Sequence, residues 1–275
     1  ENSSITYKVN ITNFGNVETG IYEIGNLPSN LTYELKNLNH EEIVEYLKSS
    51  YKVEFSFDNT MITVGASEAI DLALRATINP GDEVLIPDPS YVSYKPCVEL
   101  NGGVAVPVCC SGENGFKLTK ENLQKAITKK SKILIFPYPN NPTGGIMEKE
   151  FIEEIIPVIL ENDLLVISDE IYAELTYGSN HVSIASFDKM KDRVVLISGF
   201  SKAFAMTGWR VGYVCAPKDV LDTMLKIHQY SIICAPIFSQ YAALEGLKKG
   251  QIKVMKPKHG KELMGYLAKI RREKG

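Results

Sequence analysis

Several features are scarce in this sequence, and each scarcity excludes a class of protein. The 275 residues contain five cysteines, none at the spacing of metal ligands or of a disulfide framework, and two of them, Cys109 and Cys110, are adjacent. No apolar run approaches the roughly 20 residues of a membrane span, and the polar start has no signal-peptide core. We therefore predict reduced thiols, a cytoplasmic (cytosolic) location, no bound metal and no membrane partner.

A large excess of charge of one sign is also missing. The formal net charge is −3, with 30 basic and 33 acidic side chains, so nothing favours nucleic acid as a partner. The sequence shows no internal repeat and no low-complexity segment. What remains is an ordinary composition, 44% hydrophobic and 23% charged, which suits one large domain with or without part of a second.

Strand and helix patterns alternate through the middle of the chain. Short apolar runs predict seven strands, at residues 61–64, 83–86, 104–108, 133–136, 164–167, 194–197 and 211–215. Helical spacing predicts six helices, at residues 67–78, 91–100, 119–127, 148–162, 220–230 and 238–248, with the fourth disturbed at Pro157. The alternation predicts an α/β fold, in which helices cover both faces of a mostly parallel seven-stranded sheet.

The two ends of the chain differ from this central pattern. Residues 1–42 form an atypical N-terminal segment, of which the first 40 are rich in asparagine and lack clear periodicity. Residues 251–275 are basic, which is typical of a solvated helix or a loose tail, and they could also be the remnant of a second domain. We therefore expect the organised domain at residues 43–250.

One lysine stands out in the run from Ser198 to Gly212. Lys202 is flanked by small residues and a hydroxyl group, and Arg210 follows eight positions later. A lysine amine condenses with an aldehyde to a Schiff base, and the guanidinium fork of an arginine suits a phosphate. An aldehyde together with a phosphate describes pyridoxal 5′-phosphate (PLP). A lone lysine is most often a solvated surface residue, so the prediction depends on the motifs that accompany it.

A second motif offers contacts for the phosphate. Ala66 and Ser67 follow a predicted strand and open a helix, whose first N–H groups attract anions. Ser201 offers another hydroxyl group within the lysine motif, and Gly208 and Gly212 are expected to allow close approach of the backbone. The alternative for Ser67 is a plain helix N-cap.

Three further motifs supply partners for an aromatic ring. Asp169 directly follows a buried strand, where an ionised carboxylate needs a partner such as a protonated pyridine nitrogen. Tyr172 could reach a phenolate oxygen, and Asn141, in a loop stiffened by prolines, could bind the same oxygen. Tyr91 could stack on the ring. The alternatives are an N-cap role for Asp169, a plain turn around Asn141 and simple packing of Tyr91 at a helix start.

Together these motifs resemble those of the class I and II aminotransferases, which are fold-type I PLP enzymes. The resemblance covers about residues 43–247 and is most specific from Gly199 to Gly212. Among bacterial members, the sequences of these motifs are most similar to those of aspartate, aromatic and N-acetyl-diaminopimelate aminotransferases. The resemblance implies the large PLP-binding domain of that fold type, with the small domain largely missing and the chain truncated at both ends.

The resemblance also assigns roles to residues. It implies that Lys202 forms the Schiff base, that Asp169 pairs with the pyridinium, and that Tyr172 is the third catalytic residue. Tyr172 and Asn141 would bind the phenolic oxygen, and Tyr91 would stack on the ring. The implied cofactor site contains nine residues: Ala66, Ser67, Tyr91, Asn141, Asp169, Tyr172, Ser201, Lys202 and Arg210.

The function implied is transfer of an amino group between an L-amino acid and a 2-oxo acid, by a homodimer. Two alternatives stay open, a PLP-dependent carbon–sulfur β-lyase on the same scaffold and a truncated, non-catalytic PLP-binding relative. Family members begin with a segment that closes over the substrate, and a tyrosine motif that reaches the partner subunit's phosphate. Neither motif is found in residues 1–42, and the tail after residue 250 holds no match to the arginine that binds the substrate α-carboxylate.

Overall fold

A computed structural model describes residues 7–10, 21–24, 40–176 and 179–249 of the chain. The first two stretches are β1 (Tyr7–Asn10) and β2 (Ile21–Ile24), which pair antiparallel. Most of the predicted N-terminal segment, residues 1–42, and the whole basic tail, residues 251–275, lie outside the described residues. The fold below is therefore that of the central domain.

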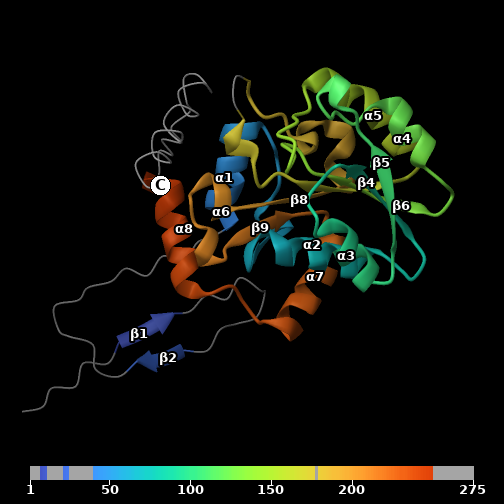
Figure 1. The fold of residues 1–275 in the computed structure, drawn as a ribbon. Helices are drawn as coiled ribbons and strands as arrows, with labels where there is room; N and C mark the ends of the chain where they lie inside the picture. The colour runs from blue at the N-terminus through green and yellow to red at the C-terminus, as the bar shows by residue number, and fades with distance from the viewer. Residues whose placement is uncertain (1–6, 11–20, 25–39, 177–178, 250–275) are drawn as a thin grey trace, which may run out of the picture.

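A seven-stranded sheet forms the centre of this domain (Figure 1). Its order is β3-β9-β8-β7-β6-β4-β5, and β9 is the one strand of this sheet that runs opposite to the other six. The mostly parallel α/β sheet predicted from the sequence is thereby confirmed. The strands are β3 (Thr60–Thr63), β4 (Glu83–Asp88), β5 (Val104–Cys109), β6 (Ser131–Phe136), β7 (Leu165–Asp169), β8 (Val194–Gly199) and β9 (Gly212–Cys215).

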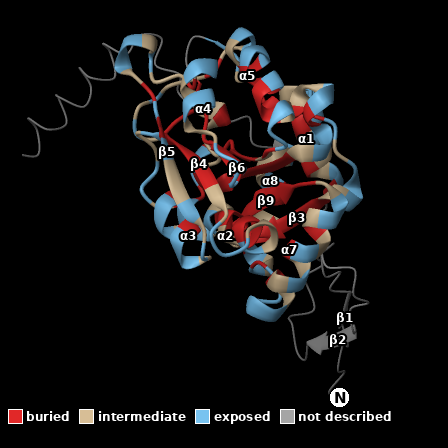
Figure 2. Ribbon diagram, turned by 90° about the vertical axis from the view of Figure 1, so that its right-hand side faces the viewer, coloured by how far each residue is buried: buried red, intermediate tan, exposed pale blue. Residues whose placement is uncertain are grey.

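Helices cover both faces of the sheet (Figures 1 and 2). One core cluster packs α2 (Gly65–Thr77), α3 (Tyr94–Leu100) and α7 (Lys218–Ser231) against one face. The other packs α1 (His40–Tyr51), α4 (Lys120–Ala126), α5 (Lys149–Glu161) and α8 (Ile237–Lys249) against the opposite face. The short helix α6 (Phe200–Ala203) follows β8 directly.

The apolar strand β6 shows why the sheet needs two covering layers. Ile133 and Ile135 belong to the first core cluster, while Leu134 and Phe136 belong to the second. Successive side chains of a strand point to opposite faces, so a continuous apolar run is stable only where helices cover both faces. Figure 2 shows the buried strands lying between partly exposed helices.

Two helices differ from their predicted form. The disturbance predicted at Pro157 does not end the helix, because α5 continues through this residue to Glu161. Proline removes one N–H from a helix, and here four fully or nearly buried isoleucines on α5 pack against the sheet and outweigh that loss. Helix α3 begins at Tyr94 rather than Tyr91, and Tyr91 lies in the turn that precedes it.

The helix α2 begins two residues earlier than predicted, at Gly65, with Val64 as its N-cap residue. Ser67 lies in the first turn and makes no capping bond, so the N-cap alternative for Ser67 is wrong. Gly65 has a φ of +76°, a left-handed conformation that suits glycine. Among the described helices, none has the length and apolar character that a membrane span requires.

Candidate active site

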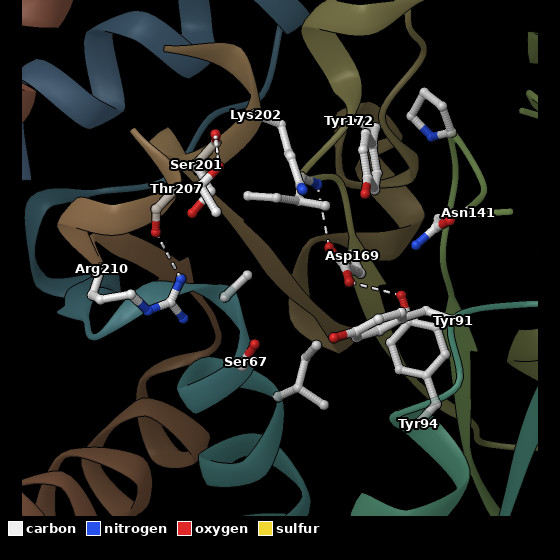
Figure 3. A pocket seen from close by; sticks show the side chains of 14 residues that line it. Ser67, Tyr91, Tyr94, Asn141, Asp169, Tyr172, Ser201, Lys202, Thr207 and Arg210 are labelled. Atoms are coloured by element: carbon white, nitrogen blue, oxygen red, sulfur yellow. Dashed lines mark hydrogen bonds between the residues drawn. The ribbon is translucent and has the colours of Figure 1, made fainter. Parts of the chain in front are cut away.

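A cavity of about 250 Å³ opens at the carboxyl ends of the parallel strands. All nine residues of the predicted cofactor site line it, although they come from six separate segments. The lining comprises Ala66, Ser67, Ile70, Tyr91, Tyr94, Pro139, Asn141, Asp169, Ile171, Tyr172, Ser201, Lys202, Thr207 and Arg210. Figure 3 shows Ser67, Ser201, Thr207 and Arg210 at one end, Asn141 and Tyr172 at the other, and Asp169 between them.

The first end of the cavity is suited to an anion. Arg210 has a left-handed φ of 54°, and its Nη1 donates to the carbonyl oxygen of Thr207 at 3.2 Å. The hydroxyl group of Thr207 in turn donates to the carbonyl oxygen of Ser201 at 2.8 Å. These bonds hold the guanidinium beside the first turn of α2, which carries Ser67. A fixed cation next to a helix N-terminus and hydroxyl groups is a typical phosphate environment.

Three glycines bring the phosphate-side segments together. A Cβ atom on Gly65 would lie 2.6 Å from Nη2 of Arg210, and one on Gly212 would lie 2.6 Å from the carbonyl carbon of Gly65. A Cβ atom on Gly199 would lie 2.8 Å from the Cα atom of Gly212. The expected close approach at Gly212 is therefore present. At Gly208, by contrast, a Cβ atom would meet no described protein atom within 4 Å, so the protein does not pack closely against this glycine.

Replacing Gly212 with alanine should therefore damage both stability and the site. The new methyl group would push β9 away from the start of α2, and overpacking of this kind costs about 1–3 kcal/mol of unfolding free energy. We expect a lower midpoint of thermal unfolding and weaker PLP binding in a fluorescence titration. Gly208→Ala is the matched control, and equal losses in both variants would contradict the packing argument.

Lys202 lies on α6, immediately after β8. Its amine faces the cavity, and Nζ lies 5.5 Å from the centre of the Tyr172 ring, within the range of a cation–π contact. Within the part of the chain that the structure describes, Lys202 forms no ion pair with an acidic side chain. The amine is thus placed to react with a ligand between the two ends of the cavity.

Asp169 ends β7 and is buried at the floor of the cavity. Its Oδ2 accepts a hydrogen bond from the hydroxyl group of Tyr94 at 2.7 Å, and its Oδ1 accepts from the N–H of Ile171 at 3.2 Å. Burial raises the pKa of Asp169, while the bond from Tyr94 lowers it by a smaller amount. The N-cap alternative is wrong, because no α-helix begins at residue 170. Among the described residues, no cationic side chain pairs with this carboxylate, so a cationic ring nitrogen would be a suitable partner.

Tyr94 is a site residue that was not predicted from the sequence. Its position inside a predicted helix gave no local signal, since the partner Asp169 lies 75 residues away. Burial and the nearby Asp169 raise the pKa of Tyr94 far above its usual value, so its hydroxyl group stays a donor.

Tyr94→Phe should therefore weaken cofactor binding. The variant removes one hydrogen bond from a buried carboxylate, and such bonds contribute about 1.5–3 kcal/mol. We expect the dissociation constant for PLP to rise about tenfold or more, measured by titration of the apoprotein. Tyr230→Phe, at an exposed position, is the control, and an unchanged constant in Tyr94→Phe would remove this residue from the site.

The loop between β6 and α5 presents Asn141 to the cavity. The neighbouring Asn140 is buried, and its Oδ1 accepts from both the N–H (3.3 Å) and the hydroxyl group (2.9 Å) of Thr143. The backbone of Asn140 pairs with Gly144 and Gly145. This loop is therefore more than a plain turn, because internal bonds hold it in one shape and point the Asn141 amide inward.

Tyr91 lies at the mouth of the cavity with 37% of its surface exposed. Its ring meets that of Tyr94 edge-on, with ring centres 5.6 Å apart. One face of the Tyr91 ring borders the space between Asp169 and Asn141 (Figure 3). This placement goes beyond packing at a helix start, since Tyr91 precedes α3 and lines the cavity.

The donor set fits PLP well. The end of the cavity beside Arg210 suits a phosphate, the amine of Lys202 suits an aldehyde, and the carboxylate of Asp169, whose two described hydrogen-bond donors are uncharged, suits a pyridinium. Among the described residues, no three histidine, cysteine, aspartate or glutamate side chains group to hold a metal ion. The fold and the donor set define the large domain of a fold-type I PLP-dependent enzyme.

Comparison with known proteins gives the family. The family model for aminotransferase class I and II matches residues 20–273, so the chain belongs to this family, whose members are PLP-dependent. The Bacillus subtilis protein YugH, provisionally named an aminotransferase, is 50% identical over 79% of this chain. An aspartate aminotransferase of Pyrococcus abyssi is 44% identical over 76% of the chain.

The chain spans only about half the length of these relatives, 57% of YugH and 54% of the Pyrococcus abyssi enzyme. A solved structure of an aromatic aminotransferase from Pyrococcus horikoshii matches with a TM-score of 0.75 and 43% identity. The match covers 76% of this chain and 57% of that one. The predicted family and fold type are thus confirmed.

Proposed function

We infer that this chain binds PLP on Lys202 and transfers an amino group between an L-amino acid and a 2-oxo acid. The observation that carries the proposal is the placement of Lys202 between an anion-binding end and the buried Asp169. Residues 43–250 would form the PLP-binding domain. The names of similar proteins include aspartate and aromatic aminotransferases, which supports an amino acid as donor.

The residues at the anion-binding end would fix the cofactor. The guanidinium of Arg210, the hydroxyl groups of Ser67 and Ser201 and the N–H of Ala66 would bind its phosphate. Asp169 would pair with the ring nitrogen. These contacts leave the aldehyde end beside Lys202.

The lysine and the residues at the other end of the cavity would take part in the reaction. When bound, PLP withdraws electrons from the substrate Cα through its ring. The amine of Lys202, once released, would move a proton between the substrate Cα and the cofactor carbon that carried the aldehyde. The amide of Asn141 and the hydroxyl group of Tyr172 would bind the phenolic oxygen, and Tyr91 would cover the ring.

The test is a reaction with a panel of L-amino acids and 2-oxoglutarate. Formation of glutamate together with the 2-oxo acid of the donor supports the proposal. Pyruvate and ammonia formed without an acceptor would instead identify a carbon–sulfur β-lyase. Normal PLP binding with no product from any donor would identify a non-catalytic relative.

We further propose that the chain forms a homodimer in the cytoplasm. Tyr230, Ile233 and Phe238, between the end of α7 and the start of α8, are 92%, 66% and 79% exposed. Large apolar side chains that are exposed close together in the sequence favour an interface between subunits. All five cysteines are free, which suits a reducing compartment. Light scattering should give twice the monomer mass, and Phe238→Asp should lower it, whereas Leu100→Asp on α3 should not.

A further inference from the structure

The turn that carries Tyr172 is short and has no regular structure beyond a 3-10 turn at Ala173–Leu175. It leaves β7 after Asp169 and lies against α6, the helix of Lys202. Within it, the N–H of Ala173 donates to the carbonyl oxygen of Glu170 at 3.0 Å, and the N–H of Leu175 donates to that of Tyr172 at 2.8 Å. These two bonds shape the turn locally, whereas its placement beside the cavity depends on contacts with other parts of the chain.

Glu170 holds the start of this turn. The residue is only 2% exposed, and its Oε1 accepts hydrogen bonds from the hydroxyl groups of Ser168 (2.9 Å) and Ser183 (2.7 Å). Its Oε2 lies 2.7 Å from Nε2 of His181. The backbone N–H of Glu170 also donates to Ile197 on β8 at 2.8 Å. A buried carboxylate with this many partners has one stable position.

Glu174 holds the other end of the turn. Its Oε1 accepts hydrogen bonds from the hydroxyl groups of Tyr46 and Tyr51, each at 2.5 Å. Both tyrosines lie on α1, and burial raises the pKa of each well above its usual value, so both stay donors. The turn is thereby tied to a helix more than 120 residues earlier in the chain.

The two ends are also joined to each other and to the lysine helix. The ring of Tyr51 meets that of His181 edge-on, with centres 5.3 Å apart. The ring of Tyr46 packs against Phe204, which directly follows α6, with centres 6.3 Å apart. Glu170, Glu174 and their partners therefore hold the turn through residues that do not line the cavity.

We propose that Glu170 and Glu174 are positioning residues, which hold the turn between them so that Tyr172 stays beside Lys202 and Asp169 stays in line with the cofactor ring. This inference rests on the proposed function for the role of Tyr172. Functional side chains must be held within about 0.5 Å, and supporting residues that lock their position carry much of that precision. Neither glutamate lines the cavity, so each acts only through the turn.

The experiment compares Glu174→Ala with Glu174→Gln. The glutamine keeps an oxygen that can accept both tyrosine hydroxyl groups, whereas alanine removes the acceptor. In the apoprotein, hydrogen–deuterium exchange of residues 171–176 should accelerate about tenfold in Glu174→Ala and stay near the original rate in Glu174→Gln. In the PLP-loaded protein, the pH midpoint of the visible absorption band should move in Glu174→Ala in the same direction as in Tyr172→Phe.

A double variant separates positioning from general damage. In the Tyr172→Phe background, Glu174→Ala should move the midpoint no further, because residues that act through one group are not additive. Additive shifts would overturn the proposal, as would unchanged exchange in Glu174→Ala. The matched control is Glu153→Ala, because Glu153 is an exposed glutamate on α5 that lines a second cavity together with Glu174; this variant should change neither measurement.

Glu170 is tested in the same way. Glu170→Ala should accelerate exchange at residues 169–172 and weaken PLP binding about tenfold, while Glu170→Gln should keep most of both. If the parent protein binds no PLP, the proposed function fails, but the exchange measurements on the apoprotein still decide whether the turn is held as described. Equal rates of hydrogen–deuterium exchange in the parent and all variants would show that Glu170 and Glu174 do not hold the turn, whether or not the protein binds PLP.

Discussion

Lys202→Ala is expected to reduce amino-group transfer by about 10⁴-fold or more, because the variant loses both the amine that binds the cofactor and the group that moves the proton. Treatment of the parent protein with borohydride and PLP should add one pyridoxyl group, and peptide mapping should place it on Lys202. The variant should acquire no such group. The midpoint of thermal unfolding of the apoprotein should change little, since the side chain points into the open cavity.

A second lysine gives the control for this experiment. Lys125→Ala removes an exposed amine from α4 and should leave labelling and turnover unchanged. Labelling of Lys202→Ala at the level of the parent would contradict the assignment. If the parent protein is labelled on Lys202 but shows no turnover, the assignment of Lys202 as the covalent site stands and the proposed amino-group transfer is contradicted.

The sequence was informative about the fold because its signals are local. A parallel sheet covered on both faces requires continuous apolar strands such as Ile133–Phe136, and these can be read directly. The order and direction of the strands could not be predicted in this way, because they depend on pairing between segments far apart in the chain. The antiparallel direction of β9 explains how Arg210, which precedes a strand, reaches the same edge as residues that follow strands.

The residues of the candidate site also fall into those that could be predicted from the sequence and those that could not. Lys202, Asp169 and Asn141 lie in motifs of a few residues, so their types and order could be recognised. Tyr94 and Glu174 could not be found, because each acts through a partner far away in the chain. The packing of Gly65 against Gly212 was hidden for the same reason, although glycine at both positions was visible. Long-range contacts of single side chains leave no periodic trace in a sequence.

Asp169→Asn should separate the function of this residue from its effect on stability. Turnover should fall about 10²–10³-fold, as expected when a fixed charge that stabilises the reacting system is removed. The apoprotein should become more stable at neutral pH. Burial raises the pKa of Asp169 in the folded apoprotein, so its ionised form is less favourable there than in the unfolded chain.

The pH dependence follows from the direction of this shift. The contribution of Asp169 to stability is fully present below its unfolded pKa of about 3.8 and is lost as the pH rises through its higher folded value. The difference in unfolding free energy between variant and parent apoproteins should therefore grow with pH, by about 1.4 kcal/mol for each unit of the shift, and then level off. Denaturant titrations at several pH values would measure it. With PLP bound, the order of stability should reverse, because only the carboxylate can pair with a cationic ring; a variant more stable in both states would show that Asp169 does not hold the cofactor.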